Sequence, residues 1–248
     1  RLFAGGWESI PSVKTGPRTI RSLFEDRDGR LWVGSNTGLA VRERGELRDC
    51  GPETGLPEVP VCAIGQDGAR NLWAYGFNSG LFRQQAGRFE RFRVPGLETN
   101  TAFMVLLGTR DGSLWVGTKQ RALCRVQGET VFVYGERHGL PPVDICGILE
   151  DDAGDLWLAC LEGVVRLGRH SLDLVARQPQ ARLECQVFDK RDGLAGQVRM
   201  TLQPVCCKAS DGRLWFATVR GVAVVDPRVI PPKPAPATVV LDELLVDH

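Results

Sequence analysis

The chain repeats one short pattern five times: an acidic turn, then Leu-Trp, then a brief apolar run. The copies span residues 26–39, 67–81, 109–123, 151–164 and 209–222. The first four tryptophans, Trp32, Trp73, Trp115 and Trp157, are 41, 42 and 42 residues apart, and Trp215 follows 58 residues later. A period near 42 built from short apolar runs is typical of a small sheet repeated around an axis. The sequence therefore predicts an all-β protein: a β-propeller of about five blades over residues 1–229.

Each repeat divides into four short strands, as residues 101–134 illustrate. Apolar stretches of five to seven residues are separated there by Asp-, Gly- and Lys-containing turns, which is typical of antiparallel hairpins. The tryptophan ring is expected to be buried between adjacent sheets. Arg70 stands where the other turns have glycine, so we expect a distorted turn in the second repeat. Glycines after the tryptophans, such as Gly34 and Gly117, are expected to permit close approach of the sheets.

The two ends of the chain suggest how the ring closes. Trp7 precedes Trp32 by 25 residues, which is the spacing between a fourth strand and the next tryptophan elsewhere in the chain. The fifth repeat has three strands and then runs into a proline-rich segment. We therefore expect the N-terminal strand to complete the last blade and so remove exposed sheet edges. An open arc would have to be covered by another copy.

Composition excludes several classes of function. The 31 basic and 30 acidic residues are interspersed and give a net charge of +1, so no nucleic-acid partner is expected. No apolar run is long enough to span a membrane. The eight cysteines show no metal-ligand or disulfide spacing, and we expect them to be buried free thiols. We predict no cofactor and no metal.

The repeat resembles the two-component regulator propeller repeat. The segments that carry the resemblance are LFEDRDGRLWVGSNTGL, ILEDDAGDLWLACLEGV and the linking TGLP (54–57), HGLP (138–141) and DGL (192–194). The sequence departs from the pattern at Thr109 and Ala209, which replace the turn aspartate, and at Arg121, which replaces a glycine. Five repeats are also fewer than the seven blades common in this family.

The resemblance implies an extracytoplasmic, periplasmic sensor domain of a bacterial signal-transduction receptor. Such a domain binds a carbohydrate or another small molecule, or mediates dimerisation. No catalytic constellation appears in the loops of this sequence, so we expect no catalysis. Any membrane contact would come through segments that this chain does not contain. Residues 230–248 resemble a proline-rich linker and the first strand of a following immunoglobulin-like module.

Function is expected in the loops, because the repeat residues have structural explanations. In a propeller, the loops between the second and third strands share the axial mouth with the loops that enter each first strand. Here those loops offer six polar side chains as candidate ligand-binding residues: Asn36, Asn78, Lys119, Arg121, Glu162 and Arg220. Such a mixed set suits hydrogen bonding to a sugar, including an acidic one, although loops are also polar simply because they face water.

Three alternatives remain open at this stage. A propeller enzyme resembling streptogramin lyases would need a metal-binding acid and a histidine at the mouth, whereas His138 reads as a turn residue. A scaffold that binds only protein, including its own copy, is the second alternative. The third concerns an insertion of about 16 residues in the fourth repeat, which is either a binding loop or a family ornament.

Overall fold

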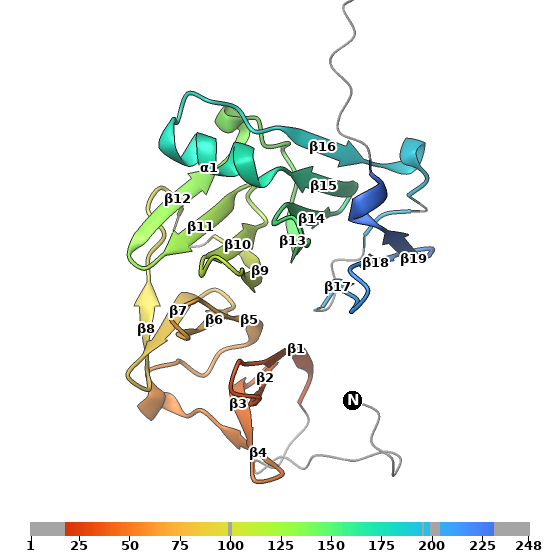
Figure 1. Ribbon diagram of the computed structural model, residues 1–248. Coiled ribbons are helices and arrows are strands. Elements are labelled where there is room, and N and C mark those ends of the chain that lie inside the picture. The colour runs from red at the N-terminus through yellow and green to blue at the C-terminus, as the bar shows by residue number, and fades with distance from the viewer. Residues whose placement is uncertain (1–17, 99–100, 195, 199–203, 231–248) are drawn as a thin grey trace, which may run out of the picture.

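The computed structural model describes residues 18–98, 101–194, 196–198 and 204–230, and its sheets lie around a common axis (Figure 1). The protein is a five-bladed β-propeller. Over the described residues, four sheets have four strands and the last has three. The strands of each sheet are antiparallel and adjoin one another in chain order, with the first strand innermost. The predicted all-β fold is confirmed.

The strand bounds follow the repeat closely. Blade 1 consists of β1 (Ile20–Glu25), β2 (Leu31–Ser35), β3 (Gly38–Glu43) and β4 (Glu46–Asp49). Blade 2 consists of β5 (Val61–Gln66), β6 (Leu72–Gly76), β7 (Gly80–Gln85) and β8 (Arg88–Phe92). Blade 3 consists of β9 (Phe103–Gly108), β10 (Leu114–Thr118), β11 (Leu123–Gln127) and β12 (Thr130–Tyr134). Blade 4 consists of β13 (Ile145–Glu150), β14 (Leu156–Cys160), β15 (Gly163–Leu167) and β16 (Cys185–Phe188). Blade 5 consists of β17 (Cys206–Lys208), β18 (Leu214–Thr218) and β19 (Gly221–Val225).

The repeated tryptophans lie in the second strands and join each blade to the next. Trp73, for example, is fully buried in a cluster with Leu106 and Leu114 of blade 3. Trp32, Trp115 and Trp157 are buried in the same way, whereas Trp215 of blade 5 is only half-buried. Burial of the ring between sheets, predicted from the sequence, is confirmed for the first four blades.

Every one of these rings carries an arginine over its face. In blades 2, 3 and 4 the arginine comes from the third strand, as with Arg125, whose Cζ lies 5.4 Å from the centroid of the Trp115 ring. Blades 1 and 5 have valine at that third-strand position, and there an arginine two residues before the tryptophan lies over the ring, as Arg30 does over Trp32 at 5.7 Å. A guanidinium over an indole is attracted by the electron-rich ring face. The chain thus supplies one cation to each indole by two different routes.

The acidic turn anchors the indole nitrogen. The Nε1–H groups of Trp32, Trp73 and Trp157 donate to Asp26, Asp67 and Asp151 at 2.8, 2.9 and 2.8 Å. The expected distortion at Arg70 is wrong. Arg70 adopts a φ of +67°, close to the +77° of Gly29, and its N–H donates to the Asp67 carbonyl as that of Gly29 does to Asp26. The turn keeps its shape, and a side chain occupies a left-handed conformation that glycine adopts more readily.

Two glycines permit close contact between blades, as predicted. A Cβ on Gly34 would lie 2.5 Å from the carbonyl oxygen of Val61 in the next blade. A Cβ on Gly117 would lie 2.6 Å from Cγ2 of Ile145. Any side chain at these two positions would force the neighbouring inner strands apart.

The insertion in blade 4 forms the helix α1 (Arg169–Arg177), between β15 and β16. Leu172 and Val175 are fully buried in the core cluster shared by blades 3 and 4, and the Tyr134 hydroxyl donates to the Leu172 carbonyl at 3.1 Å. The helix therefore caps the outer junction of these blades. The insertion therefore has a packing role, and the choice between a binding loop and a family ornament stays a prediction.

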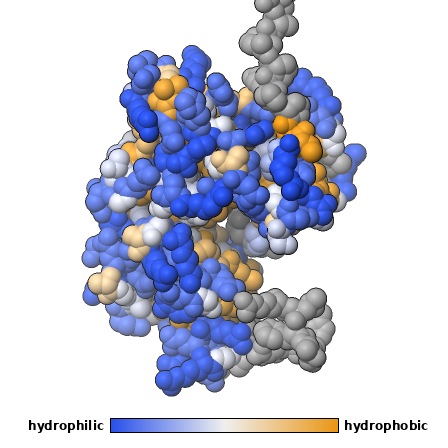
Figure 2. Space-filling view, in the orientation of Figure 1, coloured by the Kyte–Doolittle hydropathy of each residue, from blue (hydrophilic) through white to orange (hydrophobic). Residues whose placement is uncertain are grey.

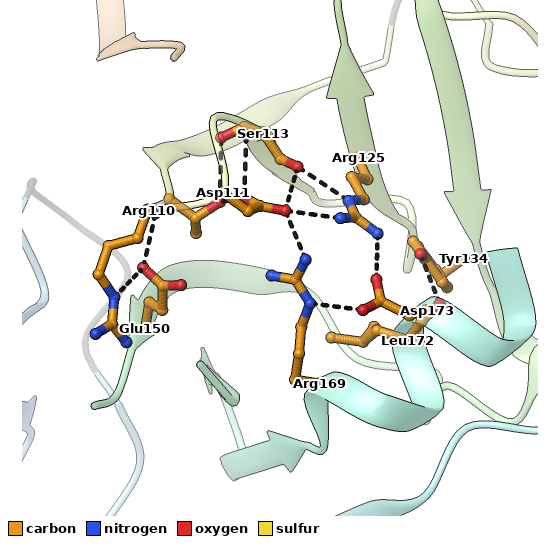
Figure 3. A network of polar contacts seen from close by, with 10 residues as sticks. Arg110, Asp111, Ser113, Arg125, Tyr134, Glu150, Arg169, Leu172 and Asp173 are labelled. Carbon is orange, nitrogen blue, oxygen red and sulfur yellow. Dashed lines mark hydrogen bonds and ion pairs between the residues drawn. The ribbon is translucent and has the colours of Figure 1, made fainter. Parts of the chain in front are cut away.

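Charged side chains fasten α1 to blade 3 (Figure 3). Arg125 donates to Asp111 and Asp173, both at 2.7 Å, and Arg169 donates to the same two carboxylates at 2.7 and 3.0 Å. Burial alone would raise the pKa of Asp111, but hydrogen bonds from Thr109, Ser113 and Arg169 hold that pKa well below its usual range. Alternating charges of this kind fix the position of the helix on blade 3.

The outward faces of the end blades are more exposed than the equivalent faces elsewhere. Leu23 of β1 is 55% exposed, whereas Ile64 and Leu106, at the same position in blades 2 and 3, are both 7% exposed. Val222 of β19 is 63% exposed, and an apolar patch marks this last blade (Figure 2). Inner strands pack in chain order from β1 to β17, with no comparable packing of β17 on β1 among the described residues. The predicted closing strand at the N-terminus and the predicted linker and strand beyond Ile230 lie outside the described residues.

The cysteines are free thiols in the structure. Cys124, Cys146 and Cys160 are buried as expected. The expectation is wrong for Cys207, which is exposed, and only partly right for four half-buried thiols: Cys50, Cys62, Cys185 and Cys206. Cys207 lies on the three-residue strand β17 of the last blade, and among the described residues no further sheet follows that blade.

Candidate functional site

Five hairpins between second and third strands form one end of the propeller, called here the mouth face (residues 35–38, 77–80, 118–122, 160–163 and 218–221). Four of the five hairpins donate a backbone hydrogen bond to the segment that enters the first strand of their own blade, and in blade 4 the Leu161 carbonyl accepts from the Val198 N–H at 3.2 Å. The backbone N–H groups of Asn36, Phe77 and Lys119 donate to the carbonyls of residues 19, 60 and 102 at 3.0, 2.8 and 3.0 Å. Val219 donates likewise to Gln197 at 2.9 Å. The two sets of loops therefore meet at the same end, as the strand order predicts, and the hairpins are held rigidly.

All six predicted binding residues are exposed on this face. The Asn36 side chain accepts from the Thr19 N–H at 2.9 Å, and Arg121 lies 3.6 Å from Glu136. Asn78 and Arg121 have left-handed backbones, with φ of +57° and +59°. Within the described part of the chain, no hydrogen bond or ion pair joins two of the six residues. The structure thus places Asn36, Asn78, Lys119, Arg121, Glu162 and Arg220 at one end of the molecule but spread over all five blades, with only Lys119 and Arg121 in the same hairpin.

Sequence reasoning missed an apolar component of the mouth face. Phe77, Leu161 and Val219 are 50%, 38% and 51% exposed. Each is the first residue after the second strand of its blade, where Asn36 and Lys119 stand in the other two blades. A large apolar residue at the tip of a tight hairpin was the available signal. The mouth face consequently presents apolar and polar groups together.

The described histidines do not lie in the mouth hairpins. His138 is fully buried in a short 3₁₀ helix, η2 (Glu136–His138), where its Nδ1 accepts from the Gly135 N–H at 3.2 Å. Burial, and then the nearby Arg137 cation, lower the pKa of His138. This agrees with its interpretation as a turn residue. His170 is exposed on α1, at the outer edge of the blades. In residues 18–230 as far as they are described, no three His, Cys, Asp or Glu side chains gather as metal ligands.

A groove of about 420 Å³ lies between blades 4 and 5, beside the third strand of the last blade. Its lining is mainly apolar and includes Trp157, Phe188, Val222 and Ile230. Because its lining includes no residue of the five mouth hairpins, the groove is not part of the mouth face.

Comparison with known proteins supports the repeat assignment. Residues 16–37 match the family model described as "Two component regulator propeller". The matched residues contain the acidic turn and Trp32 of the first repeat. No curated protein matches the chain.

Solved structures share the fold. The extracellular domain of a protein described as a hybrid two-component system of B. thetaiotaomicron matches 86% of this chain and 28% of its own, with a TM-score of 0.69 and 18% identity. PorZ, a bacterial surface component of the type-IX secretion system of Porphyromonas gingivalis, matches 84% of this chain and 32% of its own, with a TM-score of 0.61 and 18% identity. Virginiamycin B lyase of Staphylococcus aureus matches 88% of this chain and 71% of its own, with a TM-score of 0.59 and 14% identity.

This chain spans 28% of the length of the two-component extracellular domain and 32% of the length of PorZ. At these identities the likeness shows the propeller fold. The two-component protein is an extracellular domain by its description. Within the described residues, no helix of this chain has the length and apolarity needed to cross a bilayer.

Proposed function

We propose that this propeller is a non-catalytic, extracytoplasmic ligand-sensing domain of a bacterial signal-transduction receptor, and that it binds its ligand at the mouth face. The two-component regulator propeller repeat and the extracellular relatives of the same fold support the receptor context. The proposal for this chain's ligand rests on its own side chains.

The observation that carries the proposal is the rigid, amphipathic mouth face. Exposed Phe77 adjoins Asn78, and exposed Val219 adjoins Arg220, on hairpins that backbone hydrogen bonds hold to the neighbouring segments. A pre-formed surface loses little conformational entropy when it binds. Apolar groups beside amides and cations suit a small molecule with an apolar face and polar edges, such as a carbohydrate. The mouth face carries three cationic candidate residues, Lys119, Arg121 and Arg220, and one anionic candidate, Glu162. This excess of positive charge favours an acidic ligand over a basic one.

Fewer features of the chain support the two alternatives, a propeller enzyme and a protein-binding scaffold. A lyase of the streptogramin type needs a histidine at the mouth, and His138 and His170 lie elsewhere. The exposed Phe77, Leu161 and Val219 would also suit a protein partner or a second copy of this chain. Binding and assembly measurements separate these proposals.

The test is isothermal titration calorimetry with neutral and acidic oligosaccharides. The double variant Arg121→Ala with Arg220→Ala should weaken binding of an acidic oligosaccharide at least tenfold and leave the melting temperature unchanged. The matched control is Arg44→Ala with Arg177→Ala, which removes the same charge from exposed positions away from the mouth face. Binding that is unaffected by the mouth variant would contradict the proposal. Absence of binding together with concentration-dependent dimerisation would favour the protein scaffold, and product formation would favour the enzyme.

A further inference from the structure

The connection that follows the fourth strand differs in blade 2. In blades 1, 3 and 4 this connection forms 3₁₀ helices, η1 (Pro52–Thr54), η2 and η3 (Lys190–Asp192), each capped by a left-handed glycine. In blade 3 this geometry buries the His138 ring 5.4 Å from Phe132 and 6.3 Å from Tyr134. Residues 93–98 of blade 2 are all described and form no such helix, and Pro95 and Gly96 are exposed. Blade 2 therefore lacks the capped turn that buries a side chain in blade 3.

A cavity of about 270 Å³ lies at this place. Its apolar lining includes Phe92 and Phe103. Phe92 packs edge-on against Trp73 with ring centroids 4.9 Å apart, and Phe103 packs edge-on against Tyr75 at 5.6 Å. Neighbouring rings therefore fix both aromatic walls, so the cavity is pre-formed. Its volume lies slightly below the usual range for drug-sized ligands, which favours a small molecule.

Two arginines, Arg91 and Arg93, also line the cavity. Both are exposed, and neither has an ion pair with any other described residue. The guanidinium of Arg91 lies against Gly80 at the start of β7, where a Cβ would come within 3.1 Å of Nε. The absence of a side chain at Gly80 thus allows this cation to lie beside the cavity. Unpaired guanidinium groups are well suited to bind a carboxylate through two parallel hydrogen bonds.

Glu98 shares the lining with the two arginines, so the cavity has a modest positive charge and one repelling carboxylate. This arrangement disfavours a ligand with several negative charges. We infer that the cavity of blade 2 binds a small organic monocarboxylate, whose carboxylate pairs with Arg91 and Arg93 and whose apolar body lies between Phe92 and Phe103. The cavity adjoins the mouth face through Gly80, but none of the six candidate mouth residues lines it, so its ligand would contact a different set of side chains.

The test uses phenylacetate as the probe, with its uncharged amide and the dianion benzylphosphonate as comparisons. Calorimetry and ligand-observed NMR should show saturable binding of phenylacetate, with the amide and the dianion at least tenfold weaker. Arg91→Gln and Arg93→Gln should each weaken phenylacetate binding at least tenfold. Glu98→Gln should strengthen phenylacetate and reduce the discrimination against benzylphosphonate. The matched control is Arg88→Gln, at an exposed position at the other end of β8, and it should leave phenylacetate binding unchanged.

Equal binding of phenylacetate and its amide, or no phenylacetate binding at millimolar concentration, would overturn the inference. Melting temperatures of the variants establish that they are folded. If Arg91→Gln does not fold, Arg93→Gln and the three probes on the unaltered chain still decide the outcome. The Arg121 and Arg220 double variant should bind phenylacetate normally, so the outcome here is independent of the mouth-face proposal.

Discussion

Ala209 leaves the indole N–H of Trp215 without a hydrogen-bond acceptor. In blade 1 the equivalent residue is Asp26, whose carboxylate accepts from both Trp32 Nε1 and Arg30 Nε. Blade 5 retains the arginine, Arg213, but not the aspartate, and Trp215 Nε1 is buried without a partner. The same deficit recurs in blade 3, where Thr109 replaces the aspartate and Trp115 Nε1 is also unpaired. A buried donor left unsatisfied costs about 1–3 kcal/mol.

The variant Ala209→Asp should therefore stabilise the protein by about 1 kcal/mol, because it reproduces the Asp26, Arg30 and Trp32 arrangement of blade 1. Urea denaturation followed by tryptophan fluorescence measures the change in the free energy of unfolding. Ser210→Asp adds the same charge at the adjacent exposed position and is the control. A gain no larger than that of the control would show that the indole N–H is already satisfied by solvent.

The cost of removing a tryptophan should depend on whether a following blade covers it. Trp115 is fully buried, lies 5.6 Å from Tyr134 and carries Arg125 over its ring. Trp115→Ala should destabilise the protein by about 3–5 kcal/mol. Trp215→Ala should cost less than half of that, because its ring is only half-buried on the last blade. If Trp115→Ala and Trp215→Ala lower the free energy of unfolding equally in thermal or chemical denaturation, the last blade is as well covered as the third.

The sequence predicts the blades well because one physical pattern recurs at a nearly constant period. Alternating short strands, turn residues and a large ring specify each sheet locally, and the buried rings Trp32 and Trp157 confirm that pattern. The helix α1 was not predicted, although its signal was present. Leu172 and Val175 are three residues apart, and Arg169 and Asp173 form an i, i+4 ion pair.

The site was harder to predict, because a propeller's function lies in loops whose residues follow no repeat. Sequence position placed Asn78 and Arg220 on the mouth face correctly, but it could not indicate that Phe77 is exposed beside Asn78. The cavity of blade 2 is lined by Pro95, in a connection that forms no 3₁₀ helix, and by Gly80. These are differences from the repeat, and their consequence depends on packing between strands that are distant in sequence.

Thiol labelling should separate the cysteines by exposure. Cys207 is exposed and should react first with iodoacetamide in the native protein. Cys124 should remain unlabelled, since burial raises the pKa of its thiol to about 12 and blocks access. Mass spectrometry of the native protein should show one fast site, and the unfolded protein should label at all eight cysteines. Cys207→Ser should remove the fast site, and fast labelling of Cys124 would contradict the packing of blade 3 against blade 2.

The buried His138 should make stability depend on pH. Its pKa is lowered in the folded state, from a usual value of 6.5, by burial and then by the positive charge of the neighbouring Arg137. Above about pH 6.5 both folded and unfolded chains are neutral at this group, so stability is at its full value. As pH falls below that value, the unfolded chain binds the proton more readily, and stability decreases until the folded pKa is passed.

The variant His138→Thr should flatten this part of the pH profile, because threonine has no group that titrates in this range. Threonine also suits the turn, since Thr54 occupies the same position in blade 1 and donates to the Gly51 carbonyl at 2.7 Å. Melting temperatures between pH 5 and 7.5 measure the effect, and His170→Asn, on the exposed side of α1, should leave the slope unchanged. Loss of the carboxylate interactions of Asp111 and Asp173, whose folded pKa values are also lowered, belongs to a separate range below about pH 4. A slope between pH 5 and 7.5 that persists in His138→Thr would mean that another group, and not the histidine of η2, sets it.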